Sequence, residues 1–290
     1  MVRSSCAQYT MAVPCYTLPV FMALFAATLL GLIQGITEFL PVSSTGHLIL
    51  LRSLLGVVDQ NALAFDAVLH LATAAAVIVY FRRDIWVLLQ TCLRYVGRLP
   101  VGERDLALVL ALMVGTVPAV VFGLLLEDLM ETLFRAPLLV AVVLVLGSGL
   151  FVLAEHRYRA RRAPREVTAR MGLAVGFFQV LALIPGMSRS GATISGGMLL
   201  GLSRSEAARF AFLLAVPVIL GAGAKKLLEL ASLDGAIAWL PILLAAIVAF
   251  VSGMLAIHFM LGFVRRHTLW PFVWYRLALA AVVVLAVVLG

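Results

Sequence analysis

The sequence predicts an all-α polytopic membrane protein, and three observations support that fold class. Of the 290 residues, 63% are hydrophobic and only 12% are charged. The mean hydropathy of +1.11 leaves too little polar surface to cover a water-soluble globule. The hydrophobic residues also fall into ten apolar segments separated by polar or basic residues. We therefore expect about ten helices in a single integral membrane domain over residues 1–290.

The lengths of the apolar segments predict two kinds of helix. Segments 47–55 and 192–202 are too short to cross roughly 30 Å of hydrocarbon at about 1.5 Å per residue. Each follows a proline-containing polar stretch, so segments 18–40 and 171–184 are expected to form re-entrant helix-loop-helix hairpins with them. The other six are expected to be full transmembrane spans: 62–81, 106–126, 137–154, 207–228, 237–264 and 271–289.

A weak internal similarity predicts an inverted repeat. Five residue types recur at offsets of 144 or 145 positions: Gly31 and Gly176, Gln34 and Gln179, Pro41 and Pro185, Ser44 and Ser188, Phe65 and Phe210. The predicted halves are about 18–154 and 171–289, with a basic loop over 155–170 between them. One hairpin and three spans give each half an odd number of crossings, which inverts the second half. In such repeats the site forms where two broken helices meet near the midplane.

The charge distribution predicts the orientation of the chain. The net charge of +8 comes from arginines clustered between the apolar segments, notably after 62–81, over 155–170 and after 237–264. Such clusters mark cytoplasmic loops in a membrane protein and do not require a nucleic-acid partner. The acidic turn at Glu127 and Asp128 is expected on the opposite side. The first hairpin then enters from outside, and the cavity is expected to open to the periplasmic side.

The first polar stretch, residues 34–47 (QGITEFLPVSSTGH), is a candidate active site because its ionisable groups are costly at membrane depth. Glu38 and His47 are its candidate bases. Its candidate nucleophiles or hydrogen-bond donors are Ser43, Ser44 and Thr45. If a helix begins near Ser44, that serine shares a face with His47. A serine beside an imidazole, with a carboxylate nearby, is the arrangement of an activated nucleophile.

The second polar stretch, residues 185–193 (PGMSRSGAT), suits an anion. Arg189 offers a planar, permanently charged fork that matches phosphate oxygens. Free backbone amides at a helix start would add an anion site, and the candidates are Ser190, Gly191 and Ala192. Gly186 and Gly191 permit close backbone approach. A serine is expected to cap each short helix, Ser44 the first and Ser188 or Ser190 the second.

The strings TEFLPVSSTGH and PGMSRSGATISGGMLLGLSR resemble the bacterial undecaprenyl pyrophosphate phosphatases of the bacitracin-resistance type, over nearly the whole chain from Met22 onward. The resemblance implies hydrolysis of undecaprenyl diphosphate to undecaprenyl phosphate and inorganic phosphate, which recycles the lipid carrier for cell-wall synthesis and confers bacitracin resistance. It also implies the bacterial inner membrane, a divalent cation cofactor (Mg²⁺ or Ca²⁺), and no nucleic-acid partner. A homodimer stays open.

The resemblance also implies roles for individual residues. Glu38 is implied as the essential acid and as a metal ligand, and Ser44 and His47 are implied in the chemical step. The implied diphosphate-binding residues are Ser188, Arg189, Ser190 and Thr193, with Arg189 also catalytic; further candidates for substrate binding are Gln34, Ser43, Thr45, Gly186 and Gly191. Many members carry glutamate where this chain has Gln34, so Glu38 is expected to be the sole carboxylate of its motif.

Several alternatives stay open at the level of sequence. Ser44 could attack phosphorus with His47 as base, or His47 with Glu38 could activate water. Asp66 and His70, one turn apart, could pair with each other or reach the cavity. An anion transporter or a polyprenyl-phosphate flippase could use the same repeat, although neither needs a nucleophile beside a base. The acid-phosphatase-like membrane enzymes are disfavoured, because no histidine and aspartate follow the SR pair here.

Overall fold

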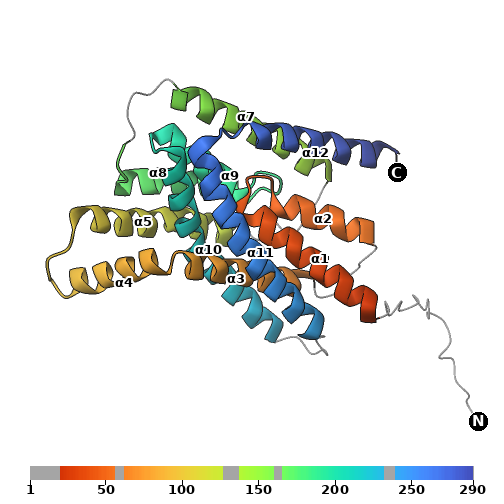
Figure 1. Ribbon diagram of the computed structural model, residues 1–290, viewed down its shortest axis with the longest axis horizontal. Helices are drawn as coiled ribbons and strands as arrows, with labels where there is room; N and C mark the ends of the chain where they lie inside the picture. The colour runs from red at the N-terminus through yellow and green to blue at the C-terminus, as the bar shows by residue number, and fades with distance from the viewer. Residues whose placement is uncertain (1–19, 56–61, 127–136, 160–164, 232–238, 290) are drawn as a thin grey trace, which may run out of the picture.

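A computed structural model describes residues 20–55, 62–126, 137–159, 165–231 and 239–289. Within these ranges the chain forms eleven helices and no strand (Figure 1). Their bounds are α1 Val20–Phe39, α2 Ser44–Leu55, α3 Ala62–Tyr80, α4 Arg82–Val96, α5 Glu103–Leu125, α7 Pro137–Arg159, α8 Ala169–Leu181, α9 Arg189–Leu200, α10 Arg204–Ala231, α11 Trp239–Arg266 and α12 Trp270–Leu289. The all-α prediction is confirmed. The acidic turn at Glu127 and the middle of the basic loop, residues 160–164, lie outside the described residues.

Six of the described helices are long and apolar enough to cross a membrane: α1, α5, α7, α10, α11 and α12. The prediction of a polytopic membrane protein is therefore confirmed. Helix α3, which is predicted as a full span, does not qualify alone; it qualifies only as a pair with α4, and that pair is bent by 82°. Helix α8, with 13 residues, is as short as a hairpin limb should be. Helix α1 differs from expectation, because its length alone is sufficient for a span.

The arginine-rich segment after α3 is predicted as a loop, and that prediction is wrong. Residues 82–96 form α4, whose side chains Ile85 and Leu88 pack against the main hydrophobic core. Arg82, Arg83 and Arg94 lie on the exposed remainder of the same helix or at its margin. The apolar side chains recur at helical spacing within the basic segment, so charge alone does not mark a loop.

Several of the main pairings between helices are related by exchange of the two halves of the chain. Helix α1 packs along α11, and its counterpart α8 packs along α5, the counterpart of α11. Two further pairs, α3 with α10 and α7 with α12, join equivalent helices. In Figure 1, α7 and α12 run side by side along the top of the view. This pairing is the pattern that a two-fold repeat generates.

Glycines set the close approach of both equivalent helix pairs. Each pair uses a G-x-x-x-G spacing, Gly31 and Gly35 in α1, Gly172 and Gly176 in α8. A methyl group at any of these four positions would overlap backbone atoms of the facing helix, α11 or α5. Without water between helices, such close van der Waals packing is what holds membrane helices together. The two helices that lead into the breaks are therefore anchored in the same way.

Arginine-rich helix ends lie together at one side of the molecule, on the left in Figure 1. Glu155 at the end of α7 accepts hydrogen bonds from Arg204 at the start of α10 (2.9 and 2.5 Å) and from the backbone N–H of Leu269 before α12 (2.8 Å). The N–H of Arg165 donates to the carbonyl of Gly201 after α9 (2.9 Å). The hairpin α8–α9 therefore begins and ends at this side. Helix α3 leads toward the same side, so α1–α2 enters from the opposite one.

Candidate functional site

Both short helices follow a non-helical break, and both breaks use the same backbone device. The residue before α2 is Ser43 (φ 74°) and the residue before α9 is Ser188 (φ 71°). Each serine Oγ accepts the N–H of the third helical residue, Gly46 at 3.4 Å and Gly191 at 3.2 Å. Such a hydrogen bond caps a helix start. A left-handed conformation costs a non-glycine residue about 1–3 kcal/mol, and such strain clusters at functional sites.

The cap of the first short helix is Ser43, so the prediction that Ser44 caps it is wrong. Ser188 caps the second, as predicted. The two caps are 188 − 43 = 145 positions apart, which shifts the repeat register by one residue from the pairing of Ser44 with Ser188. Ser44 is instead the counterpart of Arg189. These two residues are the first of α2 and α9, and both reach the same carboxylate.

That carboxylate is Glu38, in the last turn of α1, where it is 6% exposed. Its Oε2 accepts hydrogen bonds from Ser44 Oγ (2.9 Å) and from Gln34 Nε2 (2.9 Å). Its Oε1 forms an ion pair with the guanidinium of Arg189. The acid of the first break and the cation of the second therefore converge inside the protein. A buried charge of this kind is retained only when it is paired.

His70 of α3 completes this cluster. Gln34 Nε2 also contacts His70 Nδ1 (3.0 Å), which lies 3.5 Å from Glu38 Oε2. Because an amide NH₂ only donates, Nδ1 accepts the hydrogen bond in this arrangement. Asp66 pairs instead with Arg52 (2.6 and 2.8 Å). The sequence left open whether Asp66 and His70 pair with each other or reach the cavity. In the structure His70 reaches the site and does not pair with Asp66.

His47 is not placed beside Ser44, so the predicted serine–imidazole pair is absent from this arrangement of the described residues. The His47 Nδ1 lies 2.7 Å from the carbonyl of Ser43, and Nε2 lies 2.6 Å from the hydroxyl of Tyr275 on α12. The two rings are stacked with an interplanar angle of 6°. The hydrogen on Ser44 Oγ points to Glu38, which takes the place predicted for the imidazole.

The second polar stretch, residues 185–193, is only partly as predicted. The N–H of Gly191 donates to the cap Ser188, and the N–H of Ala192 donates to the Ser188 carbonyl (2.9 Å). The prediction of free amides at these two residues is therefore wrong. Thr193, fully buried, donates back to the Arg189 carbonyl (2.7 Å), a bond that satisfies its hydroxyl within the helix. The guanidinium of Arg189 is the main anion-binding group that this stretch offers.

The remaining predicted residues fix the breaks or line their surface. Ser190 Oγ donates to the carbonyl of Leu40 (3.3 Å) and so ties the second break to the first. Gly186 has a φ of 99°, and a Cβ there would overlap the backbone of α7. Gly191 lies against Phe151 and the ring of Pro41, where no larger side chain fits. Thr45 is exposed.

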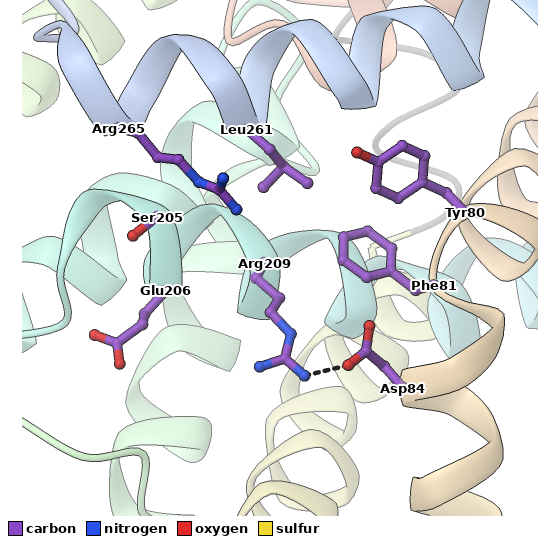
Figure 2. A pocket seen from close by; sticks show the side chains of 8 residues that line it. All are labelled: Tyr80, Phe81, Asp84, Ser205, Glu206, Arg209, Leu261 and Arg265. Carbon is purple, nitrogen blue, oxygen red and sulfur yellow. Dashed lines mark hydrogen bonds and ion pairs between the residues drawn. The ribbon is translucent and has the colours of Figure 1, made fainter.

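Two hollows lie near these helices. A cavity of about 10 Å³ borders Glu38, Arg189 and Ser190, enough for about one water. A larger one of about 350 Å³ lies at the arginine-rich side, where Arg209 is paired with Asp84 and Arg265 projects from α11 (Figure 2). None of the predicted site residues lines the larger hollow. Of the two, only the small cavity borders predicted site residues.

A divalent cation fits the oxygen donors beside this cavity. No group of three or more His, Cys, Asp or Glu side chains that could hold a metal occurs in the described part of the chain. The amide oxygen of Gln34, however, is buried without a hydrogen-bond partner among the described residues, one helical turn from Glu38. Magnesium commonly takes one or two protein oxygens together with substrate phosphates. Glu38 and Gln34 supply that number.

Sequence reasoning missed two neighbouring residues of α12 that contact both breaks. Tyr275 holds His47, and Arg276, which is 0% exposed, donates to carbonyls in the second break and in α7. A charged residue inside an apolar span is itself a signal of function. The span that carries Arg276 reads WPFVWYRLALAAVVV, so that signal is present in the sequence.

The fold and the site together define a polytopic membrane protein with a buried acid–guanidinium pair at the meeting point of two broken helices. Residues 27–282 match the family model described as bacitracin resistance protein BacA. The chain belongs to this family.

Curated relatives from several bacteria match along almost their whole length. A protein named undecaprenyl-diphosphatase from Trichlorobacter lovleyi is 45% identical over 261 residues, which cover 89% of this chain and 94% of that protein. The protein of the same name from Kineococcus radiotolerans is 43% identical, covering 93% and 95%. That of Idiomarina loihiensis is 42% identical, covering 91% and 99%.

Proposed function

We propose that this protein is an undecaprenyl-diphosphate phosphatase, which hydrolyses undecaprenyl diphosphate to undecaprenyl phosphate and inorganic phosphate. The family and the names of the relatives support this activity. The observation that carries it to this chain is the cluster at Glu38, where a hydroxyl, a carboxylate and a guanidinium from two distant segments meet. Bacitracin resistance and recycling of the lipid carrier follow from the same reaction.

The site supports a mechanism in which the substrate displaces an internal counter-ion. Arg189 is neutralised by Glu38 before substrate binds. A diphosphate presents several anionic oxygens in the geometry that a guanidinium fork prefers, so it competes with the carboxylate for Arg189. Once displaced, Glu38 is free to accept a proton. Substrate binding and activation of the base are thereby coupled.

Ser44 is the group best placed to give up that proton, because its hydroxyl already donates to Glu38 (2.9 Å). Its Oγ attacks the terminal phosphorus and its proton passes to Glu38. The bond from that phosphorus to the bridging oxygen breaks, and undecaprenyl phosphate leaves with the bonding electrons. Water then hydrolyses the phosphoserine, which releases inorganic phosphate and restores Ser44.

Two further groups support the reaction. Arg189 balances the charge that builds on the phosphoryl oxygens. A divalent cation, held by the oxygens of Glu38 and Gln34, would supply additional charge neutralisation to the diphosphate. His47, held by Tyr275, lies a turn further along α2 and is half-buried.

The protein is a multi-pass membrane protein, and its orientation follows from charge. The described helix ends at the arginine-rich side belong to the cytoplasm by the positive-inside rule. The hairpin α1–α2 then enters from the periplasmic side of the bacterial inner membrane. A cysteine at the exposed position Thr45 should react with a membrane-impermeant reagent in intact spheroplasts. Labelling only in inverted vesicles would reverse this orientation.

The activity is tested with purified protein and a long-chain prenyl diphosphate. We expect release of inorganic phosphate that stops with a chelator and returns with Mg²⁺ or Ca²⁺. Rapid acid quench with a substrate labelled in its terminal phosphate should trap label on the wild-type protein and none on Ser44→Ala. Turnover in Ser44→Ala close to that of wild type would instead assign the attack to water. Transport of a phosphorylated lipid without phosphate release would reject the enzyme.

A further inference from the structure

Arg276 is buried in the second turn of α12, and within the described residues no carboxylate forms an ion pair with it. Its donors are directed at carbonyl oxygens. Nη2 donates to Gly186 (2.9 Å), and Nη1 donates to Met187 (3.0 Å), both in the second break. Nη1 also lies 3.5 Å from the carbonyl of Pro41 in the first break. The guanidinium therefore spans both breaks.

The same guanidinium also contacts α7. Its Nε lies 3.3 Å from Ser148 Oγ, and Nη2 lies 3.2 Å from the carbonyl of Leu144. Its carbon lies 4.9 Å from the centre of the Phe151 ring. Gly147 leaves room for it, because a Cβ on that residue would overlap Nη2.

These hydrogen bonds satisfy backbone carbonyls that a broken helix leaves without partners. Where a helix is interrupted at membrane depth, its carbonyls lose their partners and water does not replace them. One guanidinium carries five N–H donors in a rigid fork, so a single side chain satisfies carbonyls from several segments at once. Lysine, with one nitrogen, would not span them. Arg276 thus holds the backbone that precedes Arg189 against the backbone that follows Glu38.

The neighbouring Tyr275 contacts His47, the histidine of α2 that follows the first break. Because the Ser43 carbonyl only accepts, His47 Nδ1 must carry hydrogen. The basic nitrogen of the neutral ring is then Nε2, and it faces the Tyr275 hydroxyl at 2.6 Å. The stacked tyrosine ring fixes the plane of the imidazole as well.

We propose that Tyr275 and Arg276 are positioning residues of the phosphatase, Arg276 by locking the two breaks in register and Tyr275 by fixing the ring of His47. This inference rests on the proposed function, because its readout is phosphate release. Neither side chain needs to touch the substrate. Their effect is on the alignment of Ser44, Glu38 and Arg189, and a misplacement of about 1 Å can cost about 100-fold in rate.

A pair of glycines on α7 provides a matched test that leaves Arg276 itself in place. Gly147→Ala inserts a methyl group against the guanidinium, whereas a Cβ at Gly149 meets nothing within 4 Å. Both changes replace glycine by a better helix former in the same helix. We expect Gly147→Ala to lower kcat by about 10-fold to 100-fold with a smaller change in KM. Gly149→Ala should match wild type.

Arg276→Lys is the direct test, and Arg204→Lys is its control. Arg204 is also a largely buried arginine, but it pairs with Glu155 at the arginine-rich side. Both variants lose a rigid fork, so both are expected to melt at a lower temperature in detergent. Only Arg276→Lys should lose kcat in the folded fraction, by about 100-fold. If both lose kcat equally, Arg276 is only a structural residue.

Tyr275→Phe keeps the stacked ring and removes the hydroxyl, so it should fold. We expect it to change the pH dependence of kcat, because His47 Nε2 then titrates without its partner. Its control is Trp274→Phe on the lipid-facing side, where the side chain is 64% exposed.

Wild-type protein without phosphate release would refute the proposed function itself. An active wild type together with normal kcat in Gly147→Ala, or in folded Arg276→Lys, overturns the role of Arg276. Failure of Arg276→Lys to fold leaves the decision to Gly147→Ala, which retains the arginine. A Tyr275→Phe profile identical to that of Trp274→Phe overturns the role of Tyr275.

Discussion

The first and second breaks share a backbone and differ in chemistry. Each has a serine in a left-handed conformation that caps the following short helix. Position by position at the offset of 145, however, Ser44 corresponds to Arg189 and Glu38 to Leu183. The first break thus holds the acid and the hydroxyl, and the second holds the cation. The two halves thus share one scaffold, and the cluster at Glu38 depends on the positions at which they differ.

The divergence also makes each half dependent on the other. Glu38 is buried and the Arg189 side chain is only 19% exposed, so either charge alone would lack a partner at membrane depth. Breaking a buried ion pair by removing one partner typically costs about 3–5 kcal/mol. The two hairpins are therefore expected to be stable together and unstable apart.

Glu38→Gln should have the largest effect, because it removes the proton acceptor. We expect kcat to fall by about 10³-fold. The matched control is Glu155→Gln, which breaks another buried ion pair at the arginine-rich side. Both variants should lose stability by about 3–5 kcal/mol, measured by thermal unfolding in detergent. If folded Glu155→Gln lost as much activity as Glu38→Gln, the loss would be one of stability alone.

Arg189→Lys is expected to come next. Lysine keeps the charge but loses the planar fork, so KM should rise by about 10-fold to 100-fold, equivalent to roughly 1.4–2.7 kcal/mol. Arg52→Lys is the control, since Arg52 also forms a forked pair with a carboxylate, Asp66. Steady-state kinetics decide between them. Equal KM values for the two variants would remove Arg189 from substrate binding.

The equivalent glutamines Gln34 and Gln179 offer the finest comparison. Gln34 contacts Glu38 and His70, whereas neither amide atom of Gln179 has a hydrogen-bond partner among the described residues. Gln34→Leu should lower kcat several-fold and raise the Mg²⁺ concentration needed for half-maximal rate. Gln179→Leu should leave kcat unchanged and stabilise the protein by about 1 kcal/mol, because it removes a buried unsatisfied amide. The same loss of activity in both would contradict the assignment.

Much of the fold and the meeting of Glu38 with Arg189 could be predicted from sequence. Proline-containing polar stretches inside apolar segments indicate breaks, and the 145-residue offset indicates that the two breaks are equivalent. Because an unpaired charge at membrane depth is costly, the acidic and basic groups of the two breaks are expected to pair. These inferences rest only on the free-energy cost of burying unpaired backbone groups and charges, and that cost does not depend on the details of side-chain packing.

The pairing of Ser44 with His47 could not be predicted, because helical spacing describes only neighbours within a helix. Ser44 is the first residue of α2 and turns back toward α1, while His47 is captured by Tyr275, 228 positions away. The prediction of free amides at the start of α9 failed for a similar reason, because the N–H of Gly191 donates to the cap residue Ser188. The periodicity of a sequence predicts neither which distant residue a side chain contacts nor which side chain caps a helix.

The placement of Arg276 on α12 has a consequence for biogenesis. Translation proceeds from the N-terminus, so α1, α2, α8 and α9 leave the ribosome before the guanidinium that satisfies their interrupted backbone. Until then the insertion machinery, water or lipid headgroups must shield those carbonyls. The nascent protein thus carries Glu38, Ser44 and Arg189 early, but Arg276 can hold the two breaks together only after the last described helix has entered the membrane.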